Sequence, residues 1–69
     1  MGKALAVITS RELMTRYSYY TTDHDWIYER MMELTGNDHE ISADAASWCE
    51  LAAIGERYEF REGVIDIEE

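Results

Sequence analysis

The sequence predicts an α+β fold in which two antiparallel helices pack on a small antiparallel sheet. Two segments in the middle of the chain have apolar residues at helical spacing and are joined by a short connection. A C-terminal stretch alternates apolar and polar residues on both sides of Glu62-Gly63, which is typical of a hairpin. The chain has 69 residues, enough for one small domain, and we expect that domain to span residues 1–69.

The N-terminal segment is the part whose pattern leaves most open. Residues 3–8 form a short apolar run, which suits either a buried strand or the start of a helix. Thr9 and Glu12 have capping-box spacing ahead of Leu13, which predicts a short helix over residues 10–15. Residues 1–13 are therefore expected to form a short helix or a loosely ordered extension. Residues 16–21 are rich in tyrosine and threonine and predict a strand.

The first long helix is predicted over residues 23–35. Thr22 is suited to cap it, and acidic residues follow in its first turn, where the helix dipole favours them. Ile27, Met31 and Leu34 recur at i, i+4 and i+7 and form its apolar stripe. Gly36 is expected to end it in a left-handed conformation.

The second helix is predicted over residues 43–54, with Ser42 as its cap and Gly55 as its end. One face is expected to be buried; its members are Ala45, Trp48, Cys49 and Ala52. The opposite face is expected to be exposed; its members are Ala46, Ser47 and Glu50.

The C-terminal hairpin is predicted to pair residues 57–61 with residues 64–68 around a Glu62-Gly63 loop. This register places Phe60 opposite Ile65 and Tyr58 opposite Ile67 on one face. On the other face it leaves two acidic residues, Glu59 and Asp66, opposite each other without a cation. Such a repulsive pair costs stability, which suggests that the acidic field itself is selected.

Charge is distributed unevenly and indicates the class of partner. The net charge is −9. Residues 1–22 hold three basic residues and one acidic residue, a balance of +2, whereas residues 23–69 hold fourteen acidic and three basic residues, a balance of −11. Such a field repels nucleic acid and anionic membranes and attracts basic surfaces. We therefore expect a basic protein surface as partner, with no direct binding of nucleic acid or membrane. Without a signal-peptide pattern or a long apolar run, a cytoplasmic location is expected.

No pattern in the chain indicates catalysis or a cofactor. Cys49 is the single cysteine, so no internal disulfide forms, and its place on an apolar helix face is typical of a buried, unreactive thiol. Two acid–His–acid triplets, at residues 23–25 and 38–40, contain metal-ligand types. A helix of ~12 residues holds its ends roughly 18 Å apart, so one ion would not bridge both. We predict a non-enzymatic protein without a metal or cofactor.

The candidate contact residues are acidic, with one aromatic among them. Three follow one side of the first helix, and two lie on the polar face of the hairpin. Trp26 projects away from the Ile27 stripe; it is expected to cover the sheet edge, to stack under Arg30, or to act as an exposed anchor. The predicted set is Asp25, Glu29, Glu33, Glu59, Asp66 and Trp26.

In size, charge and mixed helix–sheet make-up, the chain resembles the small acidic inhibitors of phages and mobile elements that mimic DNA, such as anti-restriction and anti-CRISPR proteins. This resemblance implies docking on a nuclease or another nucleic-acid-binding protein. The alternative is a structural or regulatory protein that self-associates, for example as a homodimer, through exposed aromatic residues while its charge serves solubility alone.

Overall fold

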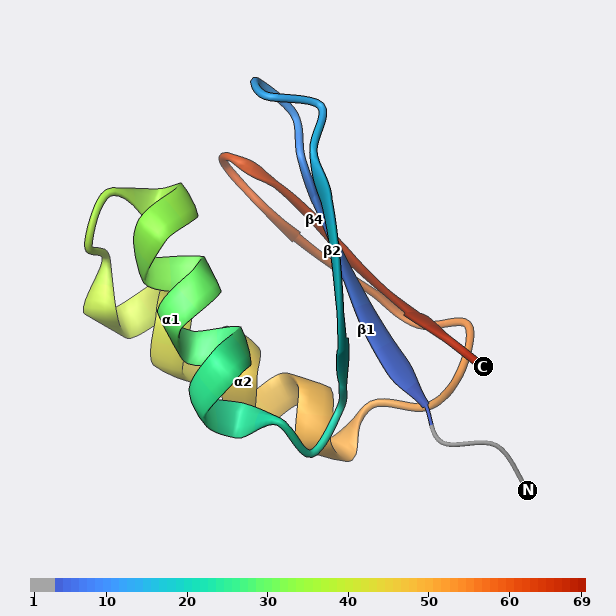
Figure 1. Ribbon diagram of the computed structural model, residues 1–69. Coiled ribbons are helices and arrows are strands. Elements are labelled where there is room, and N and C mark those ends of the chain that lie inside the picture. The colour runs from blue at the N-terminus through green and yellow to red at the C-terminus, as the bar shows by residue number, and fades with distance from the viewer. Residues whose placement is uncertain (1–3) are drawn as a thin grey trace.

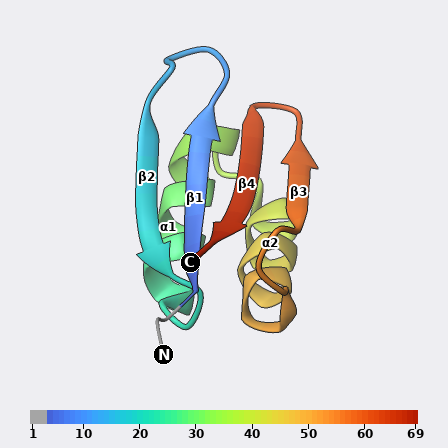
Figure 2. The same cartoon turned by 90° about the vertical axis from the view of Figure 1, so that its right-hand side faces the viewer.

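The chain folds into a four-stranded antiparallel sheet with two helices packed on one of its faces (Figures 1 and 2). The computed structural model describes residues 4–69, and the two helices and four strands all lie within that range. The predicted α+β fold is confirmed. Its elements in chain order are β1 (Leu5–Ser10), β2 (Arg16–Tyr20), α1 (His24–Thr35), α2 (His39–Leu51), β3 (Arg57–Phe60) and β4 (Gly63–Glu68).

The sheet has the strand order β2-β1-β4-β3, so the first and last strands of the chain pair at its centre. A hairpin on each side, β1–β2 and β3–β4, supplies one edge strand each. Figure 2 shows α1 behind β1 and β2, and α2 behind β3 and β4. We call the face of the sheet that the helices leave uncovered the open face.

The core lies between the central strands and the two helices. Ala6 and Ile8 of β1 and Ile65 and Ile67 of β4 point to the helices and are 0–2% exposed. The helices contribute a further set to this core: Ile27, Met31, Ala45, Ala46 and Cys49. Burying one large aliphatic side chain contributes about 1.5–3 kcal/mol, so these contacts hold the two layers together.

The N-terminal segment differs from the predicted helix. Residues Leu5–Ser10 form β1, and residues 11–13 make a turn into β2. Ser10 closes this turn: its Oγ accepts a hydrogen bond from Leu13 N (3.2 Å) and its carbonyl accepts one from Met14 N (3.0 Å). Met14 then has φ 56°, which ends the turn after one helical cycle. The expected helix over residues 10–15 is therefore wrong, because strand pairing on both sides leaves room for a single turn. Residues 1–3 of the expected extension lie outside the described residues.

The strand predicted over residues 16–21 is confirmed as β2, and the first long helix is confirmed as α1. The N-cap position of α1 is held by Asp23, one residue after the predicted Thr22. Gly36 ends the helix with φ 68°, and Asn37 N donates to Met32 O (2.8 Å). The predicted left-handed ending is confirmed, because glycine adopts a positive φ without a steric cost.

The second helix begins and ends earlier than predicted. It spans His39–Leu51, with Asp38 as its cap, where the carboxylate accepts a hydrogen bond from Ile41 N (3.1 Å). Ser42, the predicted cap, lies inside the helix and donates from Oγ to Asp38 O (2.7 Å). The helix ends when Ala52 becomes extended (ψ 146°), so Gly55 belongs to the loop before β3. Asp38 and Ser42 are both residue types that cap helices, and the helix begins after the first of them.

The faces of α2 also differ in part from the prediction. Ala45 and Cys49 are buried as expected, and Ser47 and Glu50 are exposed as expected. Ala46, expected to be exposed, is completely buried. It is part of the core cluster that α1 shares, so α2 buries one side against α1 as well as one side against the sheet.

The C-terminal hairpin has the predicted faces but a different register. Phe60 pairs with Gly63 and Tyr58 pairs with Ile65, so the loop is Arg61-Glu62 and the register is shifted by two residues. A shift of two keeps each side chain on its face because side chains alternate with period two. Gly63 is drawn into β4 by β1: a Cβ on Gly63 would collide with the carbonyl oxygen of Thr9. The contact with a third strand therefore overrides the turn preference of glycine.

Candidate functional site: the acidic helical layer

The two layers of the protein differ sharply in charge. Residues 21–54 contain both helices, and we call them the helical layer; they hold eight acidic residues and one arginine, a balance of −7. Gly55 and Glu56 are grouped with the sheet, because both are hydrogen-bonded to the backbone of Ile67 in β4. The rest of the chain therefore carries only −2 of the total charge of −9. The predicted division at residue 22 does not coincide with this one, because residues 55–69 carry −4 and lie in the sheet.

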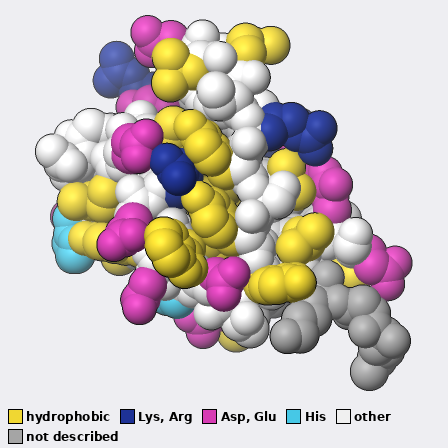
Figure 3. Space-filling model, in the orientation of Figure 1, with side chains coloured by type: hydrophobic (Ala, Val, Ile, Leu, Met, Phe, Trp, Pro, Cys, Tyr) yellow, Lys and Arg dark blue, Asp and Glu magenta, His cyan; other side chains and the backbone are white. Residues whose placement is uncertain are grey.

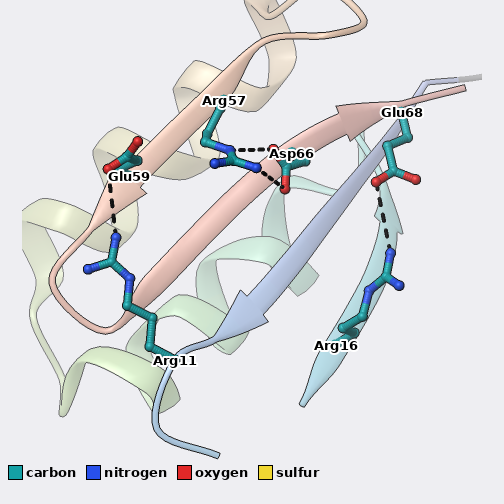
Figure 4. Close-up of polar contacts among 6 residues, drawn as sticks. All are labelled: Arg11, Arg16, Arg57, Glu59, Asp66 and Glu68. Atoms are coloured by element: carbon teal, nitrogen blue, oxygen red, sulfur yellow. Dashed lines mark hydrogen bonds and ion pairs between the residues drawn. The ribbon is translucent and has the colours of Figure 1, made fainter. Parts of the chain in front are cut away.

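The open face balances its charges in pairs (Figure 4). Three arginines each lie near one carboxylate of another strand or loop. The three contacts are Arg57 Nε–Asp66 Oδ1 at 2.7 Å, Arg11 Nη2–Glu59 Oε1 at 3.7 Å and Arg16 Nη2–Glu68 Oε2 at 3.9 Å. The hydrogen bond to Asp66 raises the pKa of Arg57. The open face consequently presents little net field to a charged partner.

These ion pairs also cover the apolar centre of the open face. Val7 points away from the helices, yet it is only 3% exposed. In the strand register, Arg16 of β2 stands opposite Thr9 of β1, and Glu68 of β4 stands opposite Leu5 of β1. The side chains of Arg16 and Glu68 therefore meet diagonally across β1, over Val7. The aliphatic parts of long charged side chains shield apolar surface in this way.

The structure contradicts the predicted acidic pair of the hairpin. Glu59 stands opposite Val64, and Asp66 stands opposite Arg57. The repulsion expected between Glu59 and Asp66 is therefore absent from the ladder, and both carboxylates lie beside an arginine. These two predicted contact residues are on the open face, away from the three predicted on α1.

The row on α1 is brought together as predicted. Asp25, Glu29 and Glu33 are exposed and follow one another at intervals of four residues, which places them on one side of the helix. Ile27 and Met31, on the inner side, are completely buried. Among the described residues of the helical layer, Arg30 is the one Lys or Arg available to this row.

Arg30 is directed toward β2 and thus contributes little to the outer surface. Its Nε and Nη2 atoms donate to Tyr19 Oη (3.1 and 3.0 Å), and its guanidinium lies 4.0 Å from the centre of the Tyr17 ring. Its Nη1 also donates to Glu33 Oε2 (2.9 Å). The hydrogen bond to Tyr19 raises the pKa of Arg30. The arginine links α1 to the edge of the sheet, and the outward surface of α1 is left acidic.

Trp26 is 60% exposed and lies one helical turn before Arg30. The i, i+4 relation places it on the side of α1 that faces β2. The ring on which Arg30 stacks is that of Tyr17 rather than the expected Trp26. Figure 3 shows a strip of apolar side chains between α1 and β2, with acidic side chains gathered over α1 beside it. Trp26 is therefore an exposed aromatic group next to an acidic row.

Sequence reasoning did not place the acidic residues of α2 in this surface. Glu40 and Asp44 are exposed on α2, and Glu50 lies at its C-terminal end. Glu50 Oε1 is 3.9 Å from His24 Nε2 of α1, so its carboxylate lies at the junction of the helices. The acidic surface thus extends over both helices. The signal that could have found it is the composition of residues 38–56, which contain acidic residues and no Lys or Arg.

The groups considered for other chemistry have structural partners. His39 Nδ1 is hydrogen-bonded to Tyr28 Oη (2.6 Å), which links α2 to α1. Burial of Cys49 raises the pKa of its thiol to about 12, so it has little thiolate character at neutral pH. Within residues 4–69, no group of three or more His, Cys, Asp or Glu side chains is arranged to hold a metal ion.

Comparison of the chain with protein-family models, curated proteins and solved structures finds no match. In the described part of the chain, neither helix has the length and apolar character needed to cross a membrane.

Proposed function

We propose that this protein is a non-enzymatic inhibitor whose acidic helical layer docks on the basic, nucleic-acid-binding surface of another protein. The observation that carries the proposal is the separation of charge between layers. Eight acidic residues and one arginine occupy the helical layer, whereas arginines on the open face pair with its carboxylates. A protein that used charge for solubility alone would have no need to gather it on one side.

The density of negative charge in the helical layer is more than half of that in a nucleic acid. The helices have 12 and 13 residues, so each is about 18–20 Å long. A DNA duplex of that length carries about 11 phosphate charges, since it has one per ~1.7 Å of its axis. The two helices together hold six carboxylates in the same length, and the cap residues Asp23 and Asp38 add one at the N-terminal end of each helix. The helical layer is therefore able to compete for lysines and arginines that otherwise contact phosphates.

The contact surface we propose is centred on α1. Asp25, Glu29 and Glu33 supply the charge, and Trp26 supplies an apolar anchor beside them. Exposed tryptophans are frequent among the residues that dominate binding energy at protein interfaces. Glu59 and Asp66 do not belong to this surface, because both lie on the open face, on the other side of the sheet from α1.

The test is competition with nucleic acid for a captured protein. The tagged chain is incubated with lysate of its source, bound proteins are eluted with salt, and each is then assayed for binding to labelled duplex DNA or RNA with and without the chain. We expect the chain to displace nucleic acid from its partner, and to do so less well as the salt concentration rises, because the contact is between opposite charges.

Matched double variants locate the surface. Asp25→Asn with Glu29→Gln removes two charges from α1, and Glu12→Gln with Glu69→Gln removes two exposed charges elsewhere, so both variants lose the same net charge. The first variant should weaken displacement about tenfold or more, and the second should change it less than twofold. Equal weakening by the two variants would show that only net charge matters and would contradict the proposed surface.

A further inference from the structure

The two edge strands of the sheet differ in how they are protected from pairing with another chain. β3 has four residues and places two charged side chains, Arg57 and Glu59, on the open face. β2 has five residues, and the three that follow Tyr17 are uncharged. Natural edge strands are usually blunted by charges, proline or bulges. β2 has no proline and one charged residue, Arg16, at its start, so its edge is the more open of the two.

The direction of the backbone groups of β2 follows from its pairing with β1. Thr21 N donates to Ala4 O (3.1 Å), so this pair is hydrogen-bonded. In an antiparallel ladder such pairs alternate with pairs that are not hydrogen-bonded. Tyr19 and Tyr17, the second and fourth residues before Thr21, therefore form backbone hydrogen bonds with β1. Arg16 and Ser18 occupy the alternate positions and direct their N–H and C=O groups to the outer edge. No strand of the described chain lies on that side.

One end of this edge is closed by the chain itself. Tyr20 N donates to Asp23 Oδ2 (3.1 Å), and Asp23 N donates to Tyr20 O (2.9 Å). The backbone groups that remain directed outward are those of Arg16 and Ser18. An added strand would consequently pair over a short segment, centred on Tyr17.

The side of this edge that faces the helices is aromatic and then acidic. Tyr17 and Tyr19 are half-buried there and bind Arg30, which also contacts Glu33. Trp26 is 60% exposed beside them, and the exposed carboxylates of Glu29 and Asp25 follow on α1. A lysine or arginine on an added strand would lay its aliphatic stem over Trp26 and reach the carboxylates of Glu29 and Asp25 with its charged end. Side chains of a strand alternate between faces, so the cations would stand at every second position.

We propose that the partner adds a strand bearing lysine or arginine at alternate positions to the outer edge of β2. This inference rests on the proposed function and names the element of the partner that the acidic layer recognises. Backbone hydrogen bonds from Arg16 and Ser18 set the register, and the acidic row of α1 selects the cations. A second copy of this chain fits the edge less well, because pairing β2 with β2 would bring two acidic α1 rows toward each other.

The experiment compares two substitutions at one position. Ser18→Pro removes the outward N–H group, and the fold tolerates it because proline is accommodated at edge positions whose N–H faces away from the sheet. Ser18→Ala keeps this N–H and removes only the hydroxyl group. The probe is a fluorescein-labelled peptide of alternating lysine and valine, about nine residues long, whose affinity is measured by anisotropy. We expect Ser18→Pro to weaken binding about tenfold or more and Ser18→Ala to change it less than twofold.

A second measurement uses the unsubstituted chain and does not depend on the folding of a variant. Hydrogen exchange at the Arg16 and Ser18 amides should be fast in the free protein and should slow on addition of the peptide. Unchanged exchange at both amides, or equal affinity of the two Ser18 variants, would overturn the strand-addition proposal. The double variant Asp25→Asn/Glu29→Gln separates the two proposals: if it weakens peptide binding while Ser18→Pro does not, the acidic surface stands and strand addition fails. If neither weakens binding, both fail.

Discussion

The helical layer and the open face of the sheet are both exposed and both rich in charged residues, but they arrange these charges in opposite ways. On the open face, Arg11, Arg16 and Arg57 each meet a carboxylate. In the helical layer, eight carboxylates share one arginine, and that arginine is bound to two tyrosines of β2 and to Glu33. Most of the net charge of −9 therefore lies on one side of this molecule.

Charged residues contribute to stability on the open face and lower it in the α1 row. Paired charges on the open face cover Val7 and thus take part in the fold. The carboxylates of the α1 row are exposed, and their mutual repulsion lowers stability. A small domain that retains such a repulsive row on one side has a surface suited to a cationic partner.

The two faces of the sheet should differ most in the free energy of unfolding that is lost when a buried residue is replaced by alanine. Ile65 is packed between the helices and the sheet, so Ile65→Ala should lower the free energy of unfolding by about 3–4 kcal/mol. Val7 is equally buried, but its cover is made of flexible charged side chains, so Val7→Ala should cost only about 1–2 kcal/mol. Urea unfolding measures both. Equal losses would mean that the open face is packed as firmly as the core.

Replacing a glycine by alanine should destabilise the protein more in the sheet than in the helical layer. Gly63→Ala should destabilise the protein by about 2–3 kcal/mol, because the added methyl group collides with the Thr9 backbone between two paired strands. Gly36→Ala should cost about 1 kcal/mol, because it places alanine at φ 68° in an open position. Thermal unfolding of both variants checks this order, and a larger loss for Gly36→Ala would contradict it.

Alkaline pH should loosen α2 from the sheet. Burial raises the pKa of Cys49 from 9.0 to about 12; burial and then the hydrogen bond to Asp44 raise the pKa of Tyr58 from 10.0 to about 12. Both groups are therefore held neutral by the fold. Their contribution to stability is complete below about pH 9 and declines as the pH rises toward about 12.

The Tyr58→Phe variant tests this contribution by itself. Phenylalanine keeps the ring that packs against Trp48 and cannot ionise. In urea unfolding at about pH 8, 10 and 11, the variant should lose less stability above about pH 10 than the unsubstituted chain. Parallel pH dependences for the two proteins would show that Tyr58 does not contribute.

The smallest effects should be those of single carboxylates, and their sign should differ between the layers. Glu29→Gln relieves repulsion in the α1 row and should raise the melting temperature slightly. Asp66→Asn weakens the contact with Arg57 and should lower the melting temperature slightly. Both shifts should diminish at high salt, where exposed charges are screened. Shifts of the same sign in thermal unfolding would be inconsistent with one balanced and one unbalanced face.

Much of the architecture follows from local sequence pattern. The apolar stripe of α1, its end at Gly36 and the strand β2 are confirmed, because each is determined by residues close together in sequence. The predictions are wrong where contacts between segments distant in sequence determine the structure. The register of the C-terminal hairpin depends on the contact of Gly63 with Thr9 of β1, and Ala46 is buried because α1 lies against α2.

The candidate surface could be predicted in part. The row of Asp25, Glu29 and Glu33 follows from helical periodicity alone, and the structure retains it. The pairing of Glu59 with Arg11 could not be predicted, because it joins the β1–β2 turn to the edge strand β3. The full extent of the acidic layer likewise depends on the packing of α1 beside α2.

The separation of charge between the two layers is tested most directly by mapping the electrostatic potential over the protein in solution. Amide proton relaxation is measured with a cationic and with an anionic nitroxide probe, and the ratio of the two effects is compared between exposed amides of α1 and α2 and those of β3 and β4. We predict that the cationic probe is concentrated at the helices and that the two probes approach the sheet about equally. A ratio that is the same on both sides, or larger at the sheet, would contradict the separation of charge.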